Sequence, residues 1–182
     1  MRQRRVGVVL QSPYAIYDRR VHQYSGANIE LMNWLASTLE VKLVWRQFPD
    51  QAALENAARK GQIDLVPGLA QNPAGLRLWL YSDPYLRIPQ LLVGERTGDV
   101  AVDLELLAER DPLAVLQHSA VENYLRANYS NLVLAGVNSE RQALRYLLGK
   151  QARYAVIDEA QFRLLADESE FSRLAVVGDI GF

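Results

Sequence analysis

Residues 54–67 read L-E-N-A-A-R-K-G-Q-I-D-L-V-P, and this stretch decides the fold class. Leu54 and Ala57 recur at the spacing that gives a helix one apolar face. Gly61 is the residue type that commonly ends a helix, and the apolar run Ile63–Val66 predicts a strand. A helix followed directly by a buried strand is typical of α/β proteins, in which helical crossovers join parallel strands.

The same pattern returns in residues 144–158, L-R-Y-L-L-G-K-Q-A-R-Y-A-V-I-D, where Gly149 ends a helix and Tyr154–Ile157 predicts a strand. The two stretches are alike in pattern without forming a repeat of fixed period. We therefore predict an α/β fold of two lobes, each a mostly parallel sheet with helices on both faces. The expected parts are lobe one (1–89), a hinge or linker (90–99), lobe two (100–177) and the start of a return crossing (178–182), with the C-terminal part of lobe one absent.

Apolar periodicity and turn signals predict the remaining elements. Ser119 with Glu122, and Ser139 with Gln142, have the spacing of capping boxes that open helices. The expected strands are 6–10, 42–48, 63–66, 90–93, 113–116, 132–135, 154–157 and 174–177, and the expected helices are 26–39, 50–60, 103–109, 119–128, 139–149 and 159–167.

Composition excludes several classes of protein. The 182 residues are 49% hydrophobic and 23% charged with a net charge of −1, which indicates a folded chain with no general attraction to nucleic acid. With no cysteine, the chain has no disulfide or thiol nucleophile. The apolar run Val6–Leu10 is shorter than the ~7–15 residues of a signal-peptide core.

No familiar catalytic motif is present, and the two histidines, His22 and His118, lie far apart in the sequence. We therefore predict a domain that is not an enzyme and that uses no cofactor and no metal.

The order of motifs resembles a known family. Ser12-Pro13-Tyr14 follows the first strand, Gly26 opens a helix, and Lys60–Gly68 (K-G-Q-I-D-L-V-P-G) precedes Tyr81–Tyr85 (Y-S-D-P-Y). Together these motifs resemble the bacterial family 3 periplasmic solute-binding proteins, the Venus-flytrap fold, and especially the sensor domains of hybrid histidine kinases. The resemblance covers nearly the whole chain.

This resemblance implies a periplasmic ligand-sensing domain. Its implied partners are a small molecule that binds between the lobes and an output domain of the parent protein. It implies no nucleic-acid partner and leaves a homodimer open. Two alternatives stay open as well: a free amino-acid-type binding protein of an ABC importer, and the regulatory module of a murein lytic enzyme. The domain would lie outside the cytoplasm, either as part of an inner-membrane protein or free in the periplasm.

The resemblance also implies a set of ligand-binding residues. Tyr14 would pack on the ligand or, alternatively, cover the sheet edge, and Ser119 would face the ligand or serve only as a helix cap. Asp158, at the carboxyl end of a strand, would receive a ligand cation or cap the next helix. The full set is Tyr14, Gly68, Leu69, Gln71, Asn72, Arg77, Ser119 and Asp158.

One departure from the family bears on the ligand. Amino-acid-binding members carry an Arg before the F-S-x-P-Y motif that holds the ligand carboxylate, and Gly75 occupies that position here. Arg77 lies two residues further on. Because an unpaired carboxylate in a partly dry site is costly, we predict that free α-amino acids bind poorly. The ligand should be neutral, cationic or held mainly by backbone donors of residues 68–72.

Overall fold

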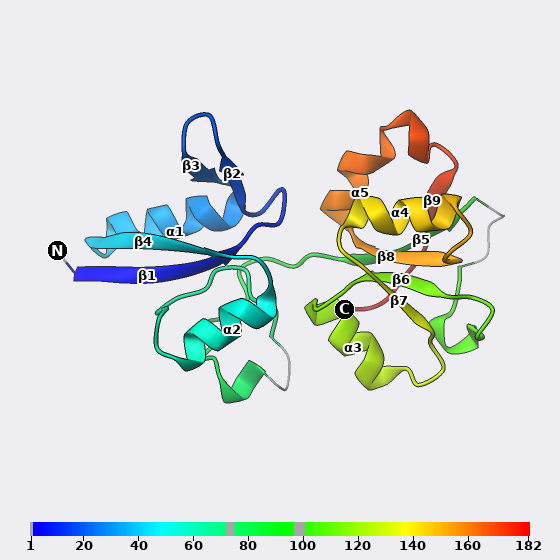
Figure 1. Ribbon diagram of the computed structural model, residues 1–182, viewed down its shortest axis with the longest axis horizontal. Coiled ribbons are helices and arrows are strands. Elements are labelled where there is room, and N and C mark those ends of the chain that lie inside the picture. Colours follow the sequence, from blue (N-terminus) through cyan, green and yellow to red (C-terminus); the bar gives the residue numbers. More distant parts are fainter. Residues whose placement is uncertain (1, 72–74, 97–100) are drawn as a thin grey trace. The chain divides into compact units, whose positions relative to one another are not determined.

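The computed structural model describes residues 2–71, 75–96 and 101–182, which form two compact α/β units, Met1–Leu86 and Arg87–Phe182 (Figure 1). Among these described residues, no helix has the length and apolar character needed to cross a membrane.

The first unit is built on two parallel strands. β1 pairs with β4 along its whole length, from Arg2 opposite Val41 to Val9 opposite Phe48. Val6, Val8 and Ile29 are buried between this pair and its helices. The elements are β1 (Arg2–Val9), β2 (Ile16–Asp18), β3 (Gln23–Ser25), α1 (Ala27–Thr38), β4 (Val41–Phe48), α2 (Gln51–Arg59) and the 3-10 turn η1 (Gly75–Arg77).

The predicted strand 63–66 forms a single bridge to β1 instead of a full ladder. Leu65 lies opposite Val6 in parallel orientation, as an extended third strand would. The backbone N–H of Arg5, however, donates to the Asp64 carboxylate at 2.7 Å. Because that donor bonds a side chain, it is not available to a neighbouring strand. The short hairpin of β2 and β3 was also not predicted, since its three-residue strands carry no apolar alternation.

The second unit contains a five-stranded mixed sheet in the order β7-β6-β8-β5-β9. β6 is parallel to both β7 and β8, whereas β5 is antiparallel to β8 and β9. The sheet is therefore less uniformly parallel than the sequence predicts. The strands are β5 (Gln90–Glu95), β6 (Leu113–Leu116), β7 (Leu134–Val137), β8 (Tyr154–Asp158) and β9 (Leu174–Asp179), and the helices are α3 (Ala120–Asn128), α4 (Glu140–Leu148), α5 (Glu159–Ala166) and the 3-10 turns η2 (Leu104–Leu106) and η3 (Ser169–Phe171).

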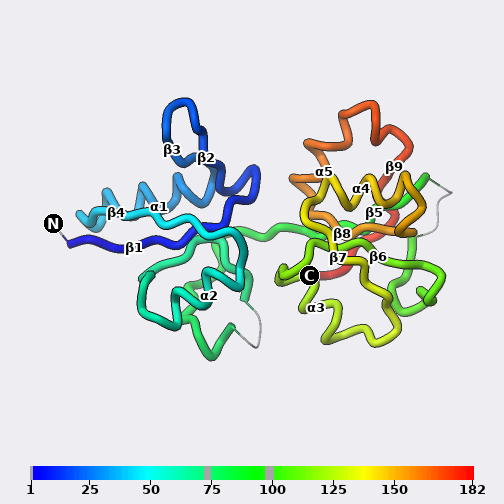
Figure 2. The backbone as a smooth tube through the Cα atoms, viewed as in Figure 1, coloured from blue at the N-terminus to red at the C-terminus, as the bar shows by residue number. Residues whose placement is uncertain are grey.

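Helices cover both faces of this sheet, which confirms that part of the predicted fold (Figures 1 and 2). Val93 and Leu144 belong to a core cluster under α4 and α5, and Leu92 and Leu125 belong to the cluster on the α3 side. Because successive side chains of a strand point to opposite faces of the sheet, Leu92 packs in one core cluster and its neighbour Val93 packs in the other.

Residues 90–95 of the predicted linker are thus a buried strand of the second unit, and residues 97–100 lie outside the described part of the chain. The predicted helix 103–109 is the short turn η2.

Both predicted capping pairs open helices, although Glu122 and Gln142 accept from the N–H groups of His118 and Asn138, one residue before each cap. The Ser119 and Ser139 hydroxyls accept from the N–H groups of Glu122 and Gln142, each at 3.1 Å. Each box therefore satisfies helix-terminal donors that have no intrahelical partner.

Candidate functional site

Asp158 ends β8 in the second unit and is 4% exposed. Its Oδ1 accepts from the backbone N–H of Gln161 at 2.8 Å, so the side chain caps α5. A carboxylate at the carboxyl end of a parallel strand lies where open α/β sheets bind ligands. Asp158 therefore has a structural role as a cap, and its position is also compatible with the predicted contact to a ligand.

Glu140 adds a second carboxylate near Asp158. It is the first residue of α4, which follows β7, and it is partly buried. Burial raises the pKa of Glu140, and the negative charge of Asp158 adds to that rise. Two carboxylates near each other at one edge of a sheet create a negative potential there, which favours a cation over an anion.

Ser119 follows β6, the parallel neighbour of β8, at the same edge of the sheet. Its hydroxyl donates to the carbonyl oxygen of Leu116 at 2.6 Å while accepting from Glu122. A hydroxyl has one proton and two lone pairs, so the remaining capacity of Ser119 is that of an acceptor. In this state it suits a ligand that donates hydrogen bonds.

The side chain of Asn28 connects the predicted ligand segments of the first unit. It is 9% exposed, and its Oδ1 accepts from the Tyr85 hydroxyl at 2.9 Å. Its backbone N–H donates to the carbonyl oxygen of Tyr14 at 3.0 Å. Gly68 packs so closely on the Asn28 amide that a Cβ at position 68 would overlap it. The segments around Gly68 and Tyr85 therefore meet at the side-chain amide of Asn28, and the segment around Tyr14 is held by the backbone N–H of the same residue.

The environment of Tyr85 supports this arrangement. Burial raises the pKa of the Tyr85 phenol, and a hydrogen bond from the backbone N–H of Gly68 acts in the opposite direction. The hydrogen bond that the Tyr85 hydroxyl donates to Asn28 therefore lies close to the backbone of Gly68.

The other predicted residues of the first unit differ in exposure. Gln71 and Arg77 are exposed, Leu69 is partly buried and Tyr14 is buried. Arg77 ends η1, whose first residue, Gly75, is buried. Asn72 lies outside the described residues.

Sequence reasoning missed Asn28 and Glu140. Asn28 is a polar residue beside Ile29, inside an otherwise apolar helix start, and a polar residue in that place is a signal that could have drawn attention to it. Glu140 carried no such signal, because an acidic residue in the first turn of a helix is common.

The described residues contain no group of three or more His, Asp or Glu side chains that could hold a metal ion. The polar groups gathered at the strand ends of the second unit are capped helix starts and a pair of carboxylates.

The fold, two α/β units with this strand topology, is that of the two-lobed periplasmic-binding-protein-like class. Residues 5–168 match the sequence profile of the bacterial extracellular solute-binding proteins, family 3. The chain belongs to this family, which is a family of solute-binding proteins and not of enzymes.

Solved structures with the same fold include sensor domains and an arginine-binding protein. A histidine kinase sensor domain with similarity to periplasmic binding proteins is 22% identical, with a TM-score of 0.80 over 98% of this chain and 77% of that one. The periplasmic VFT2 domain of Bordetella pertussis BvgS is 19% identical, with a TM-score of 0.79 over 99% of this chain and 76% of that one.

An ancestral arginine-binding protein bound to arginine is 21% identical, with a TM-score of 0.77 over 97% of this chain and 79% of that one. At these identities the likeness establishes the fold. No curated protein gives a significant sequence match to the chain.

Proposed function

We propose that this chain is the extracytoplasmic ligand-sensing domain of a bacterial signal-transduction protein, a sensor histidine kinase. In this proposal residues 1–89 and 100–177 act as two lobes, and a small molecule that contacts both lobes favours their closure. A ligand can shift such an equilibrium only through contacts that differ between the open and closed forms. The family and the two sensor domains of the same fold support this proposal.

The observation that carries the ligand class is the acidic edge of the second unit. Asp158 is buried beside Glu140, and Ser119 retains only acceptor capacity there. In the first unit, Gly75 occupies the sequence position at which amino-acid-binding members carry an Arg. We therefore propose a cationic or neutral ligand that donates hydrogen bonds and that carries no carboxylate.

Arginine and agmatine test this proposal, because agmatine has the same guanidinium group and lacks the carboxylate. A cation at 100 times its dissociation constant adds ~2.7 kcal/mol to the free energy of unfolding. For a chain of this size that raises the melting temperature by about 5–10 °C. We expect a shift with agmatine or a related amine, a smaller shift with arginine and none with glutamate.

The outcome that contradicts the ligand class is a larger shift with arginine or glutamate than with agmatine. If Arg77→Ala then removed that shift, Arg77 would be holding a carboxylate in place of the missing Arg. Isothermal titration calorimetry with the same compounds separates binding from an indirect effect on stability.

A free binding protein of an importer is the second candidate, and the similarity to the arginine-binding protein favours it. The two candidates differ in what the ligand changes. In membranes that contain the full-length gene product, sensing predicts that the ligand changes the rate of autophosphorylation. Transport predicts instead that uptake of the labelled ligand requires this protein while phosphorylation is unaffected.

A further inference from the structure

A polar recess of about 460 Å³ lies in the second unit, and we call it the basic recess. It is bordered by the end of β5, the residues after α4 and the turn η3 before β9. Its lining residues are Glu95, Leu148, Lys150, Ser169, Glu170, Ser172 and Arg173.

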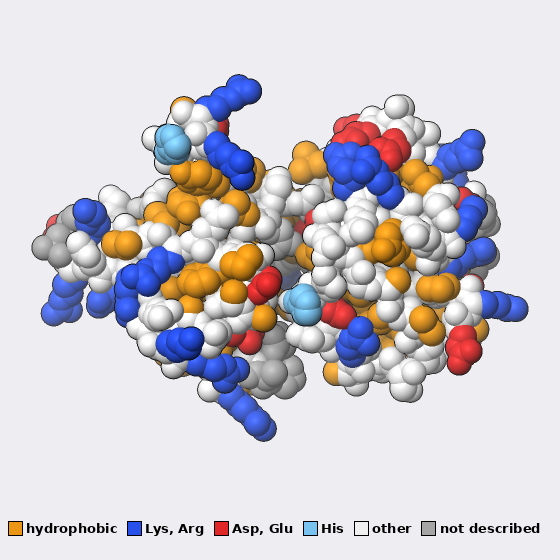
Figure 3. Space-filling model, viewed as in Figure 1, with side chains coloured by type: hydrophobic (Ala, Val, Ile, Leu, Met, Phe, Trp, Pro, Cys, Tyr) orange, Lys and Arg blue, Asp and Glu red, His pale blue; other side chains and the backbone are white. Residues whose placement is uncertain are grey.

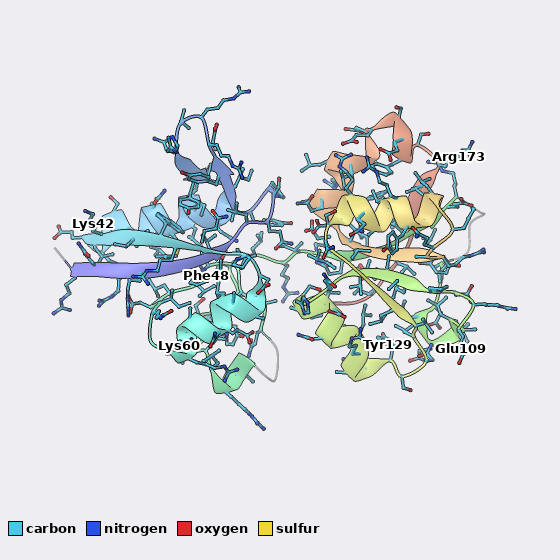
Figure 4. All side chains as sticks on the ribbon, in the orientation of Figure 1. Lys42, Phe48, Lys60, Glu109, Tyr129 and Arg173 are labelled. Carbon is cyan, nitrogen blue, oxygen red and sulfur yellow. The ribbon has the colours of Figure 1, made fainter. Side chains whose placement is uncertain are left out.

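Strand register places the basic recess at the opposite end of the sheet from Asp158. Gln90 of β5 pairs with Asp158, whereas Glu95 of the same strand pairs with Leu174. Five residues of strand correspond to about 17 Å. Figure 4 labels Arg173 beside the start of β9. The basic recess is therefore separate from the candidate ligand site.

Two cations and two carboxylates line the basic recess, and the charges of Arg145 and Arg153 act on its two carboxylates. Lys150 pairs with Glu95 at 2.5 Å, and Arg145 pairs with Glu170 at 2.8 Å. Lys150, with smaller contributions from the charges of Arg173 and Arg153, holds the pKa of the Glu95 carboxyl below its usual value. Figure 3 shows Lys and Arg side chains gathered at this end of the second unit.

Several donors in the recess have no protein partner. Among the described residues, neither an ion pair nor a hydrogen bond is formed by the Arg173 guanidinium, and the hydroxyls of Ser169 and Ser172 form no hydrogen bond. Phosphate oxygens are commonly bound by donor groups of this kind, namely an Arg guanidinium, a Lys ammonium and hydroxyls.

The backbone at Lys150 is a second, independent observation. Lys150 has a φ of 58°, in the left-handed region that L-residues other than glycine disfavour. In the first unit the corresponding turn after α2 places Gly61 there, with a φ of 65°. The order Lys-Gly of the first unit is thus Gly-Lys in the second, which puts a cationic residue of the recess in the left-handed region, as Glu40 is after α1. Strain of this kind supports a hypothesis of function.

We propose that the basic recess binds an oxyanion of the phosphate type through Arg173, Lys150 and the hydroxyls of Ser169 and Ser172. This site goes beyond the proposed function and does not depend on it. The phosphate group could be a free ion or part of an anionic lipid headgroup, and both offer the same oxygens to the recess.

The test titrates the full chain with inorganic phosphate at low ionic strength, with chloride as the reference anion, and follows backbone amide shifts by NMR. We expect saturable shifts at residues 148–150 and 169–173. Arg173→Ala should weaken binding by about tenfold or more, as expected when a hydrogen bond to a charged group is lost. Arg126→Ala is the matched control, since Arg126 is an exposed arginine of the same unit that pairs with Glu122 away from the recess.

Lys150→Gly separates binding from stability. If Lys150 serves the anion, this variant binds phosphate more weakly while its melting temperature stays the same or rises, because the left-handed turn is relieved. A lower melting temperature with unchanged phosphate binding would show that the Lys150–Glu95 pair is only structural and would overturn the proposal.

Vesicles distinguish the two sources of phosphate. Binding to phosphatidylglycerol but not to phosphatidylcholine vesicles, lost in Arg173→Ala, indicates a headgroup, whereas binding of inorganic phosphate alone indicates a free ion. If neither probe binds in a way that depends on Arg173, the proposal is wrong.

Discussion

Replacement of Gly68 by alanine tests whether the buried Asn28 amide holds the first unit's predicted ligand segments together. Gly68 has a φ of 71°, and a Cβ there would overlap the Asn28 side chain. Gly61 is a matched control, since its φ is 65° and a Cβ there would meet nothing within 4 Å. Both glycines lie in the same unit, so both variants report on the same unfolding transition.

The two substitutions share one cost and differ in another. Each places alanine in the left-handed region, at about 1–2 kcal/mol, and each gains the same small benefit from a less flexible unfolded chain. Gly68→Ala must also displace the Asn28 amide, which breaks its bond with Tyr85 and leaves buried polar atoms without partners, at about 1–3 kcal/mol. We therefore expect Gly68→Ala to lose about 1–3 kcal/mol more than Gly61→Ala.

Urea unfolding of wild type, Gly68→Ala, Gly61→Ala and Tyr85→Phe measures these differences. Tyr85→Phe alone removes one hydrogen bond from a half-exposed ring and should cost about 0.5–1.5 kcal/mol. In the background of Gly68→Ala it should cost less, because the bond is already broken. Equal losses for the two alanine variants, or full additivity with Tyr85→Phe, would refute the role assigned to Asn28.

Three further predictions concern single side chains. Asp158→Asn should abolish binding of a cationic ligand in calorimetry. Because Asn also caps helices well, the free energy of unfolding should change by less than ~1 kcal/mol. Unchanged ligand affinity would show that Asp158 does not bind the ligand. Ser119→Ala should lower stability by about 1–2 kcal/mol in urea unfolding, and no loss would contradict its role as a cap. Arg5 holds the pKa of the Asp64 carboxyl well below its usual range. The pair therefore contributes its full stabilisation at pH values above the unfolded-state pKa of about 4. This contribution is lost as the pH falls through the lower folded-state pKa. Because both side chains are partly exposed, the effect is small, and the stability difference between wild type and Asp64→Asn should shrink on acidification; a difference that grows instead would contradict the pairing.

Local patterns made much of the fold predictable. Apolar periodicity located α2, α4 and β8, and the capping boxes located the starts of α3 and α4, because each of these signals depends on residues within a few positions of one another. Where the signal was weak, the prediction was wrong or incomplete: η2 was expected to be a longer helix, and the β2–β3 hairpin was missed.

The candidate site was predictable only in part. Asp158 and Ser119 stand out because each precedes a helix and follows an apolar strand, and the structure finds both side chains acting as caps. Whether either side chain also binds a ligand remains a prediction. Glu140 had no distinguishing signal, since its importance comes from its nearness to Asp158, a residue of another strand end.

By itself, the sequence determined the α/β class, the family and the positions of the main helix starts, because periodicity, capping and short motifs are properties of neighbouring residues. Only the tertiary structure decided that β5 runs antiparallel to β8 and that Asn28 meets Gly68 and Tyr85. Asn28 and Tyr85 are 57 positions apart in the chain, and contacts across such distances form through packing of the whole unit. No local pattern encodes them, since their free energy depends on burial that exists only in the folded state.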